Sequence, residues 1–310
     1  MDSYGVVYVA SQKHKFLCEA IASAESLKEK VPDISITLFT DLEDLHELKI
    51  RPFDKIIPIP SDQEDCLKGS PSWGQSLFAN VMILIGSYMQ PWGRGIRAKV
   101  RRLIVPSLLQ SWGRGCHAKI MSFIHSPYQR TVFLDSDTRI LSDEFMRVFE
   151  FLENHSIAMV PCTKDNSYTC SLYGPMFNSG VIAYRKDAQV DTLFMEWKKL
   201  NRVHFELASL EPPGSTPYLS HINSAQRRVL LVVDQTSLAQ LLSPILNKFD
   251  VAVKALDETW NARNYPRDRL GGVIIDHANC HKINSDQVSG FLKSRGIRLS
   301  TKAMLQTLFK

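Results

Sequence analysis

Two aspartates one residue apart, Asp135 and Asp137, are the residues of this sequence best suited to chemistry. They follow residues 131–134, an apolar run typical of a short buried strand, and ligands of open α/β sheets bind beyond the carboxyl ends of such strands. Carboxylates at this spacing on an extended turn can face one hard cation such as Mg²⁺ or Mn²⁺. The pair could equally cap a turn and the helix after it, so the motif alone leaves both interpretations open.

The elements that must position this pair alternate between strands and helices. A strand over residues 4–10, a helix over 16–30 and a strand over 34–40 precede it. This alternation predicts an α/β fold with a mostly parallel, Rossmann-like sheet flanked by helices. Further strands are expected over residues 55–59, 157–161, 177–184, 249–255 and 272–275, and further helices over 142–152, 187–200 and 234–242.

Length and composition favour one globular domain. The chain has 310 residues, of which 44% are apolar, and no low-complexity tract. The longest apolar run, residues 77–89, is too short to span a bilayer. The first apolar run ends at a basic turn, residues 13–15, and is not expected to be a signal peptide. The six cysteines form no Cys-x-x-Cys pair and are expected to be free thiols. We therefore expect a cytoplasmic protein.

The charge is unevenly distributed. Although the net charge is only +5, no Asp or Glu occurs between Asp65 and Asp135, while nine Lys and Arg do. This basic strip, residues 68–130, favours nucleotide phosphates, a nucleic acid, or peripheral contact with an anionic membrane, or is simply a solvated helix face. Nucleic acid is not expected, because the strip lacks the regular aromatic residues of single-strand binders.

Common nucleotide-binding motifs are missing. The turn after the first strand has no Gly-x-Gly-x-x-Gly and the chain has no phosphate loop, so a dinucleotide cofactor is not expected. One local duplication stands out: residues 92–100 recur as residues 112–120. The second copy carries Lys119 into a helix that leads directly to the Asp135 strand.

A set of features in fixed order resembles the family-8 glycosyltransferases, the group of glycogenin, the lipopolysaccharide galactosyltransferases and the galactinol synthases. The resemblance covers residues 4–282 and is most specific at Leu134–Asp137, Phe177–Val181 and Asp234–Gln235. It implies a single GT-A type domain of the nucleotide-diphospho-sugar transferase superfamily. Its parts would be a nucleotide-binding half (1–140), a donor and acceptor half (141–284) and a C-terminal helical tail (285–310).

The resemblance also implies an activity. The protein would be a hexosyltransferase-type enzyme that uses Mn²⁺ or Mg²⁺. It would move a sugar from a nucleotide-diphosphate donor, with a UDP-sugar as the first candidate, and retain the configuration of the sugar. The acceptor, whether glycan, lipid-linked or protein, is not named by the sequence. The implied metal ligands are Asp135, Asp137 and His277; the nucleotide-sugar residues are Ala10, Ser11, Lys119, Asp135, Ser136 and Lys282; the catalytic residues are Asn178, Asp234 and Gln235.

Departures from the family pattern leave alternatives open. The segment His277–Lys282 lacks the family's glycine and its Pro-Trp. Either His277 or His281 could therefore be the third metal ligand. Asp234 and Gln235 could be a helix cap, and Trp260–Asn261 is expected to serve packing. A sugar-phosphate nucleotidyltransferase is disfavoured because residues 9–15 contain no glycine. A non-catalytic binder of anionic ligands, built on the basic strip, is the third alternative.

Overall fold

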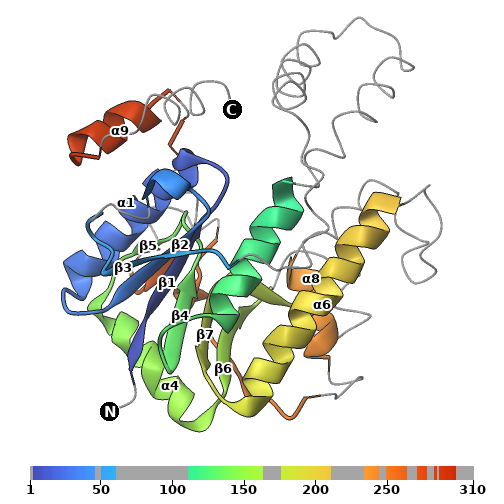
Figure 1. Ribbon diagram of the computed structural model, residues 1–310. Coiled ribbons are helices and arrows are strands. Elements are labelled where there is room, and N and C mark those ends of the chain that lie inside the picture. Colours follow the sequence, from blue (N-terminus) through green and yellow to red (C-terminus); the bar gives the residue numbers. More distant parts are fainter. Residues whose placement is uncertain are drawn as a thin grey trace, which may run out of the picture.

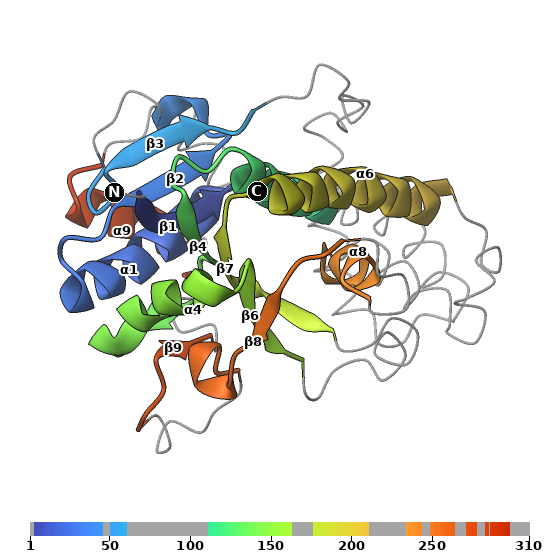
Figure 2. The same ribbon diagram turned by 90° about the horizontal axis from the view of Figure 1, so that it is seen from below.

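A central β-sheet lies between two layers of helices (Figures 1 and 2). The computed structural model describes residues 3–45, 50–60, 111–162, 176–210, 234–243, 249–263, 271–277, 283–284 and 286–297. The strands of the main sheet are β1 (Tyr4–Ala10), β2 (Ile36–Thr40), β3 (Lys55–Pro58), β4 (Arg130–Leu134), β6 (Ile157–Pro161), β7 (Phe177–Arg185) and β8 (Val253–Ala255).

The sheet is mostly parallel, as the alternation of elements predicted. Its seven strands run in the order β3-β2-β1-β4-β7-β6-β8. The pairs β1–β2, β2–β3, β1–β4 and β6–β8 are parallel, and β7 is antiparallel to both of its neighbours. The chain passes from β1 to β2 on one side and later returns to β4 on the other. The carboxyl ends of β1 and β4 therefore flank a topological switch point, where ligands of open α/β sheets bind.

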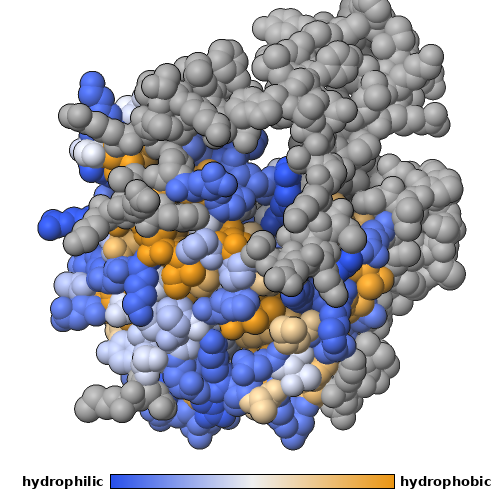
Figure 3. Space-filling view, in the orientation of Figure 1, coloured by the Kyte–Doolittle hydropathy of each residue, from blue (hydrophilic) through white to orange (hydrophobic). Residues whose placement is uncertain are grey.

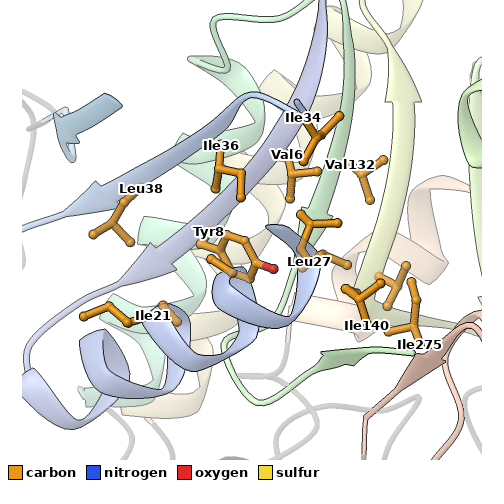
Figure 4. Close-up of a cluster of buried hydrophobic side chains, with 14 of the residues drawn as sticks. Val6, Tyr8, Ile21, Leu27, Ile34, Ile36, Leu38, Val132, Ile140 and Ile275 are labelled. Atoms are coloured by element: carbon orange, nitrogen blue, oxygen red, sulfur yellow. The ribbon is translucent and has the colours of Figure 1, made fainter. Parts of the chain in front are cut away.

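The two faces of the sheet have different cores. α1 (His14–Lys30) and α4 (Val148–Asn154) cover a mainly aliphatic face, part of which Figure 4 shows, and α9 (Val288–Ser294) packs on α1. A helix over residues 111–124, α6 (Ala188–Leu210) and α8 (Asp234–Leu241) cover the other face. That face has an aromatic centre, made of Phe123, Phe133, Tyr184, Phe194 and Trp197.

A second, two-stranded sheet joins distant parts of the sequence. β5 (Arg139–Ile140) pairs antiparallel with β9 (Ile275–Asp276), and Ala262 forms a bridge to Asp276. Of the strand predicted over 272–275, only Ile275 lies in β9, which pairs with the segment that follows the aspartate turn. Short 3₁₀ helices occur at η1 (Glu43–Leu45), η3 (Asp143–Arg147) and η5 (Glu258–Trp260).

Several predicted features lie outside the described residues. They are the basic strip from residue 68 to 110 with the first copy of the duplication, the loop 163–174, the segment 211–226, His281, Lys282 and most of the C-terminal tail. The second copy lies within the helix over 111–124. Among the described residues, no helix has the length and apolar character needed to cross a bilayer. On the face in Figure 3, the described surface is mostly hydrophilic, with smaller apolar groups between.

Candidate active site

Three side chains from distant parts of the sequence meet at the carboxyl end of β4. Ligand atoms of Asp135, Asp137 and His277 all lie within 4.8 Å of one another. His277 Nε2 is 3.1 Å from Asp137 Oδ1 and 3.7 Å from Asp135 Oδ2. The imidazole is buried, whereas the Asp135 and Asp137 side chains keep 33% and 26% of their surface exposed. The cluster is therefore open to a ligand on its carboxylate side.

The alternation of β4 explains the direction of Asp135. Phe133 packs in the aromatic core and Leu134 in the aliphatic core. Since side chains alternate along a strand, Asp135 continues the face of Phe133. Its backbone N–H donates to Gly180 O at 2.8 Å, which ties the end of β4 to β7.

The turn after Asp135 is held by hydroxyl groups on the buried side. Thr138 donates to Asp135 O from its backbone N–H at 3.2 Å and from its hydroxyl at 2.8 Å. Ser23 of α1 contacts the Thr138 hydroxyl at 2.9 Å, and Ser26 accepts from Ile140 N–H at 3.0 Å. These bonds fix the backbone on both sides of Asp137.

Gly180 leaves the space that the cluster occupies. A Cβ atom at this position would overlap His277 Cε1, and it would lie 2.7 Å from His277 Nδ1 and 2.8 Å from Asp135 Oδ2. A side chain here would therefore push the imidazole away from the carboxylates. This close approach explains the glycine that the sequence places within Phe177–Val181.

Lys119 lies on the opposite side of Asp135 from His277. Its ammonium group is 3.1 Å from Asp135 Oδ1, 3.2 Å from Asp234 Oδ2 and 3.0 Å from Ser179 Oγ. Its Nζ also lies 4.8 Å from the centre of the Phe133 ring. Burial alone lowers the pKa of Lys119, but the two carboxylates outweigh this and hold the pKa above its ordinary value. Lys119 is thus a permanent cation that donates hydrogen bonds to Asp135 and Ser179 and forms an ion pair with Asp234.

The charges in direct contact do not balance. Asp135, Asp137 and Asp234 face one ammonium group, Lys119, which leaves two negative charges when His277 is neutral. Burial raises the pKa of Asp137, but the hydrogen bond and charge of His277 outweigh it and hold the pKa below its ordinary value. Two carboxylates and one imidazole are ligands that divalent ions such as Mn²⁺ accept. The donor set and the excess negative charge both fit a divalent cation.

A fourth acidic residue, Glu19, lies near the site, and no sequence motif pointed to it. Glu19 of α1 is buried, 3.7 Å from Lys15, and interacts electrostatically with Asp137. Burial raises the pKa of its carboxyl group, with Lys15 opposing the rise. Glu19 therefore adds to the negative potential behind the cluster.

The residues expected to bind the nucleotide lie along the same edge. Ala10 ends β1 and is buried, Ser11 follows it, and Ser136 lies half-buried between the two aspartates. The next residue, Gln12, has a left-handed backbone with φ of 68°. Its N–H donates to Asp41 Oδ1 at 2.7 Å, and its side chain exchanges two hydrogen bonds with Ser111. These contacts hold the turn after β1 in place.

The expected catalytic residues fall into two groups. Asp234 begins α8 and contacts Lys119, with Gln235 half-buried beside it. Asn178 on β7 is buried on the histidine side, where its Oδ1 accepts from Gly180 N–H at 2.8 Å and from Asn261 Nδ2 at 2.9 Å. The structure thus brings Asp234 to the lysine and Asn178 to the histidine.

Trp260 and Asn261 are neighbours in the sequence but have different surroundings. Trp260 packs in the aliphatic core and meets the Phe151 ring edge-on, as expected for a packing residue. Asn261 Oδ1 instead lies 2.6 Å from His277 Nδ1. Sequence reasoning placed Asn261 with the tryptophan, because nothing local shows that it lies beside His277.

Comparisons with known proteins identify similar structures but no family model. No protein-family model matches the chain, and no curated protein matches it. One similar solved structure is the galactosyltransferase LgtC in complex with donor and acceptor sugar analogues. It is 11% identical with a TM-score of 0.44, over 97% of this chain and 99% of that one.

Two further similar structures are also named as transferases. Mouse xyloside xylosyltransferase 1 is 13% identical with a TM-score of 0.39, over 91% of this chain and 99% of that one. The glycosyltransferase GlyE of Streptococcus pneumoniae is 11% identical with a TM-score of 0.42, over 98% of this chain and 63% of that one. All three similar structures are glycosyltransferases by name, the class that the order of sequence motifs resembles. With TM-scores below 0.5, the assignment of an activity rests on the residues of the site.

Proposed function

We propose that this protein is a metal-dependent glycosyltransferase that moves a sugar from a nucleoside-diphosphate donor, with UDP-sugars as the first candidates. The observation that carries the proposal is the meeting of Asp135, Asp137 and His277 at the switch point of the sheet, with Lys119 on the other oxygen of Asp135. A diphosphate is the ligand that needs both a divalent ion and a cation beside it.

Each part of the site has a proposed role in holding the donor. Asp135, Asp137 and His277 would hold Mn²⁺ or Mg²⁺, which would supply charge stabilisation to the departing diphosphate. Ala10 and Ser11 would line the pocket of the base, and Ser136 would lie against the ribose and diphosphate. Lys119 donates to Asp135 and Ser179 and pairs with Asp234 without a hydrogen bond. We propose that its remaining proton reaches a phosphate oxygen of the donor.

The sugar and acceptor would lie on the side of α8. Asp234 and Gln235 would position the acceptor and steady the positive charge that develops on the sugar ring, with Asn178 shaping the pocket from β7. Transfer with retention by same-face attack needs no dedicated strong base, which agrees with an Asp234 that is paired with a lysine. Lys282, outside the described residues, would contact the diphosphate. A cytoplasmic location, with peripheral contact to an anionic membrane, completes the proposal.

The described part of the basic strip gives less support to the alternative of a non-catalytic protein that binds anionic ligands. Lys119 is buried and faces two carboxylates, and Arg130 lies 4.0 Å from Glu153. Side chains engaged in this way offer little positive charge to a nucleic acid. A nucleotidyltransferase would need a glycine-rich activating loop after β1, where this chain has Gln12 in a left-handed conformation held by Asp41.

The test is a binding panel with UDP, GDP, CDP and ADP, each measured with Mn²⁺ and with a chelator. We expect one diphosphate to raise the melting temperature only when Mn²⁺ is present, and calorimetry to show one site. A donor screen with the matching nucleotide-sugars should then detect release of that diphosphate. Binding of equal strength with chelator, or no response to any diphosphate, would contradict the proposal.

A further inference from the structure

The buried side of His277 is connected to the backbone of β7 through two asparagines. Gly180 N–H lies 2.8 Å from Asn178 Oδ1, and Asn261 Nδ2 lies 2.9 Å from the same oxygen. Asn261 Oδ1 in turn lies 2.6 Å from His277 Nδ1. The three side chains are 3–5% exposed, so water does not compete for these bonds.

The direction of every bond in this chain follows from its first donor. A backbone N–H can only donate, so the Asn178 atom that faces Gly180 must be the carbonyl oxygen. That oxygen can only accept, so the Asn261 atom that faces it must be the amide nitrogen. The remaining atom of the Asn261 amide is therefore oxygen, and the His277 nitrogen that contacts it must carry a proton.

From this geometry we infer that Asn261 is a positioning residue that fixes the tautomer of His277. With the Nδ1 proton held by Asn261, Nε2 is the nitrogen that can give up its proton to bind an ion; it lies 3.1 Å from Asp137 Oδ1, within hydrogen-bond distance, and 3.7 Å from Asp135 Oδ2. Only a ring nitrogen without a proton can bind a metal ion. The inference rests on the metal site of the proposed function and adds a residue to it that contacts neither the ion nor the donor.

The backbone places Asn261 beside the ring independently of its side chain. Ala262 N–H donates to Ile275 O at 2.9 Å, and His277 N–H donates to Ala262 O at 2.9 Å. The backbone around Ala262 is therefore in fixed register with the backbone of residues 275–277. A substitution of the residue 261 side chain leaves the backbone of His277 in place. A change in metal affinity then reports the hydrogen bond to Nδ1.

Two substitutions separate the two bonds of the Asn261 amide. Asn261→Ala removes both, whereas Asn261→Asp keeps an acceptor for Nδ1 but replaces the donor to Asn178 with a carboxylate oxygen that faces Asn178 Oδ1. Removing the partner of a metal-binding histidine typically lowers affinity by about 10- to 100-fold. We therefore expect Mn²⁺ affinity, measured by calorimetry, to fall by about this factor in Asn261→Ala and to be kept in Asn261→Asp, because a carboxylate also makes the ring more basic.

A matched control guards against a loss of folding. Asn201 of α6 is as buried as Asn261 and donates to Ser237, outside the metal cluster. Asn201→Ala should lower the melting temperature without changing Mn²⁺ affinity. Equal losses of Mn²⁺ affinity in Asn261→Ala and Asn261→Asp would show that the bond to Asn178 matters and would overturn the inference.

Nitrogen NMR of the imidazole tests the tautomer without a metal ion. With His277→Gln used to assign the signals, the metal-free protein should show a protonated Nδ1. An Nδ1 without a proton would overturn the inference whether or not the protein binds Mn²⁺. Wild-type protein that binds no Mn²⁺, yet has a protonated Nδ1, would contradict the proposed function alone.

Discussion

The two halves of the candidate site are built in different ways. The carboxylate half consists of Asp135 and Asp137 at one strand end with Lys119 beside them; its members carry charge, and the aspartates are partly exposed. The histidine half consists of His277 and Asn261 with Asn178 behind them; its members are buried and connected by hydrogen bonds.

This difference determines what each half is sensitive to. Coulomb attraction falls slowly with distance, so the carboxylate half tolerates small displacements but responds to changes of charge and pH. A hydrogen bond is lost when its distance or angle becomes poor, so the histidine half tolerates no displacement of the ring. Substitutions that change charge and substitutions that change shape should therefore give different results.

The largest effect on metal binding is expected for Asp137→Ala. The variant loses a ligand and one of the two excess negative charges, so its Mn²⁺ affinity should fall by more than the roughly 100-fold upper range for residues behind a ligand. Its fold should stay intact in chelator, with a modest loss of stability because Asp137 is hydrogen-bonded to the buried His277. Calorimetry with Mn²⁺ measures the affinity, and Asp143→Ala, at an exposed aspartate in η3, is the control. Metal binding that survives in Asp137→Ala would place the ion elsewhere.

The largest effect on stability is expected for Lys119→Met. Removing one partner of a buried ion pair typically costs about 3–5 kcal/mol, and here Asp135 and Asp234 both lose their cation. Unpaired carboxylates bind protons more readily, so the deficit should shrink as the pH falls from 7 to 5. Urea unfolding at both pH values measures it. Lys199→Met, which breaks an exposed pair with Glu196, should cost less than about 1 kcal/mol.

Gly180→Ala tests shape without changing charge. Its Cβ overlaps the imidazole, so we expect a weaker Mn²⁺ site and a destabilisation of about 1–3 kcal/mol from overpacking. Gly290→Ala is the matched control, because a Cβ there meets nothing within 4 Å and α9 should gain up to about 1 kcal/mol. Unchanged Mn²⁺ affinity in Gly180→Ala would mean that the histidine half adapts, and the contrast between the halves would not hold.

The smallest effect is expected for Glu19→Gln. Because the folded-state pKa of Glu19 lies above its ordinary value, its protonated form favours the fold at low pH, and this contribution is lost as the pH rises through the folded-state pKa. The uncharged variant should therefore melt slightly higher than the wild type at pH 7.5 and equally at pH 4. Glu29→Gln, at an exposed position of α1, is the control.

The sequence predicted the carboxylate half better than the histidine half for a physical reason. The apolar run of β4 marks the strand end at which Asp135 and Asp137 lie, and Lys119 lies in the helix that leads to that strand. Both features are local. Asn261 and Glu19 reach the site only through tertiary contacts, the bridge of Ala262 to Asp276 and the packing of α1, which no local pattern encodes.

The pairing of β5 with β9 has a consequence for the synthesis of the chain. A ribosome completes Asp135 and Asp137 about 140 residues before His277, and β5 has no partner strand until β9 has emerged. Until then the growing chain offers an incoming ion two aspartates and no imidazole. Tight metal binding is thus expected only after most of the polypeptide has been made, so a nascent chain halted before residue 275 should leave Mn²⁺ in solution.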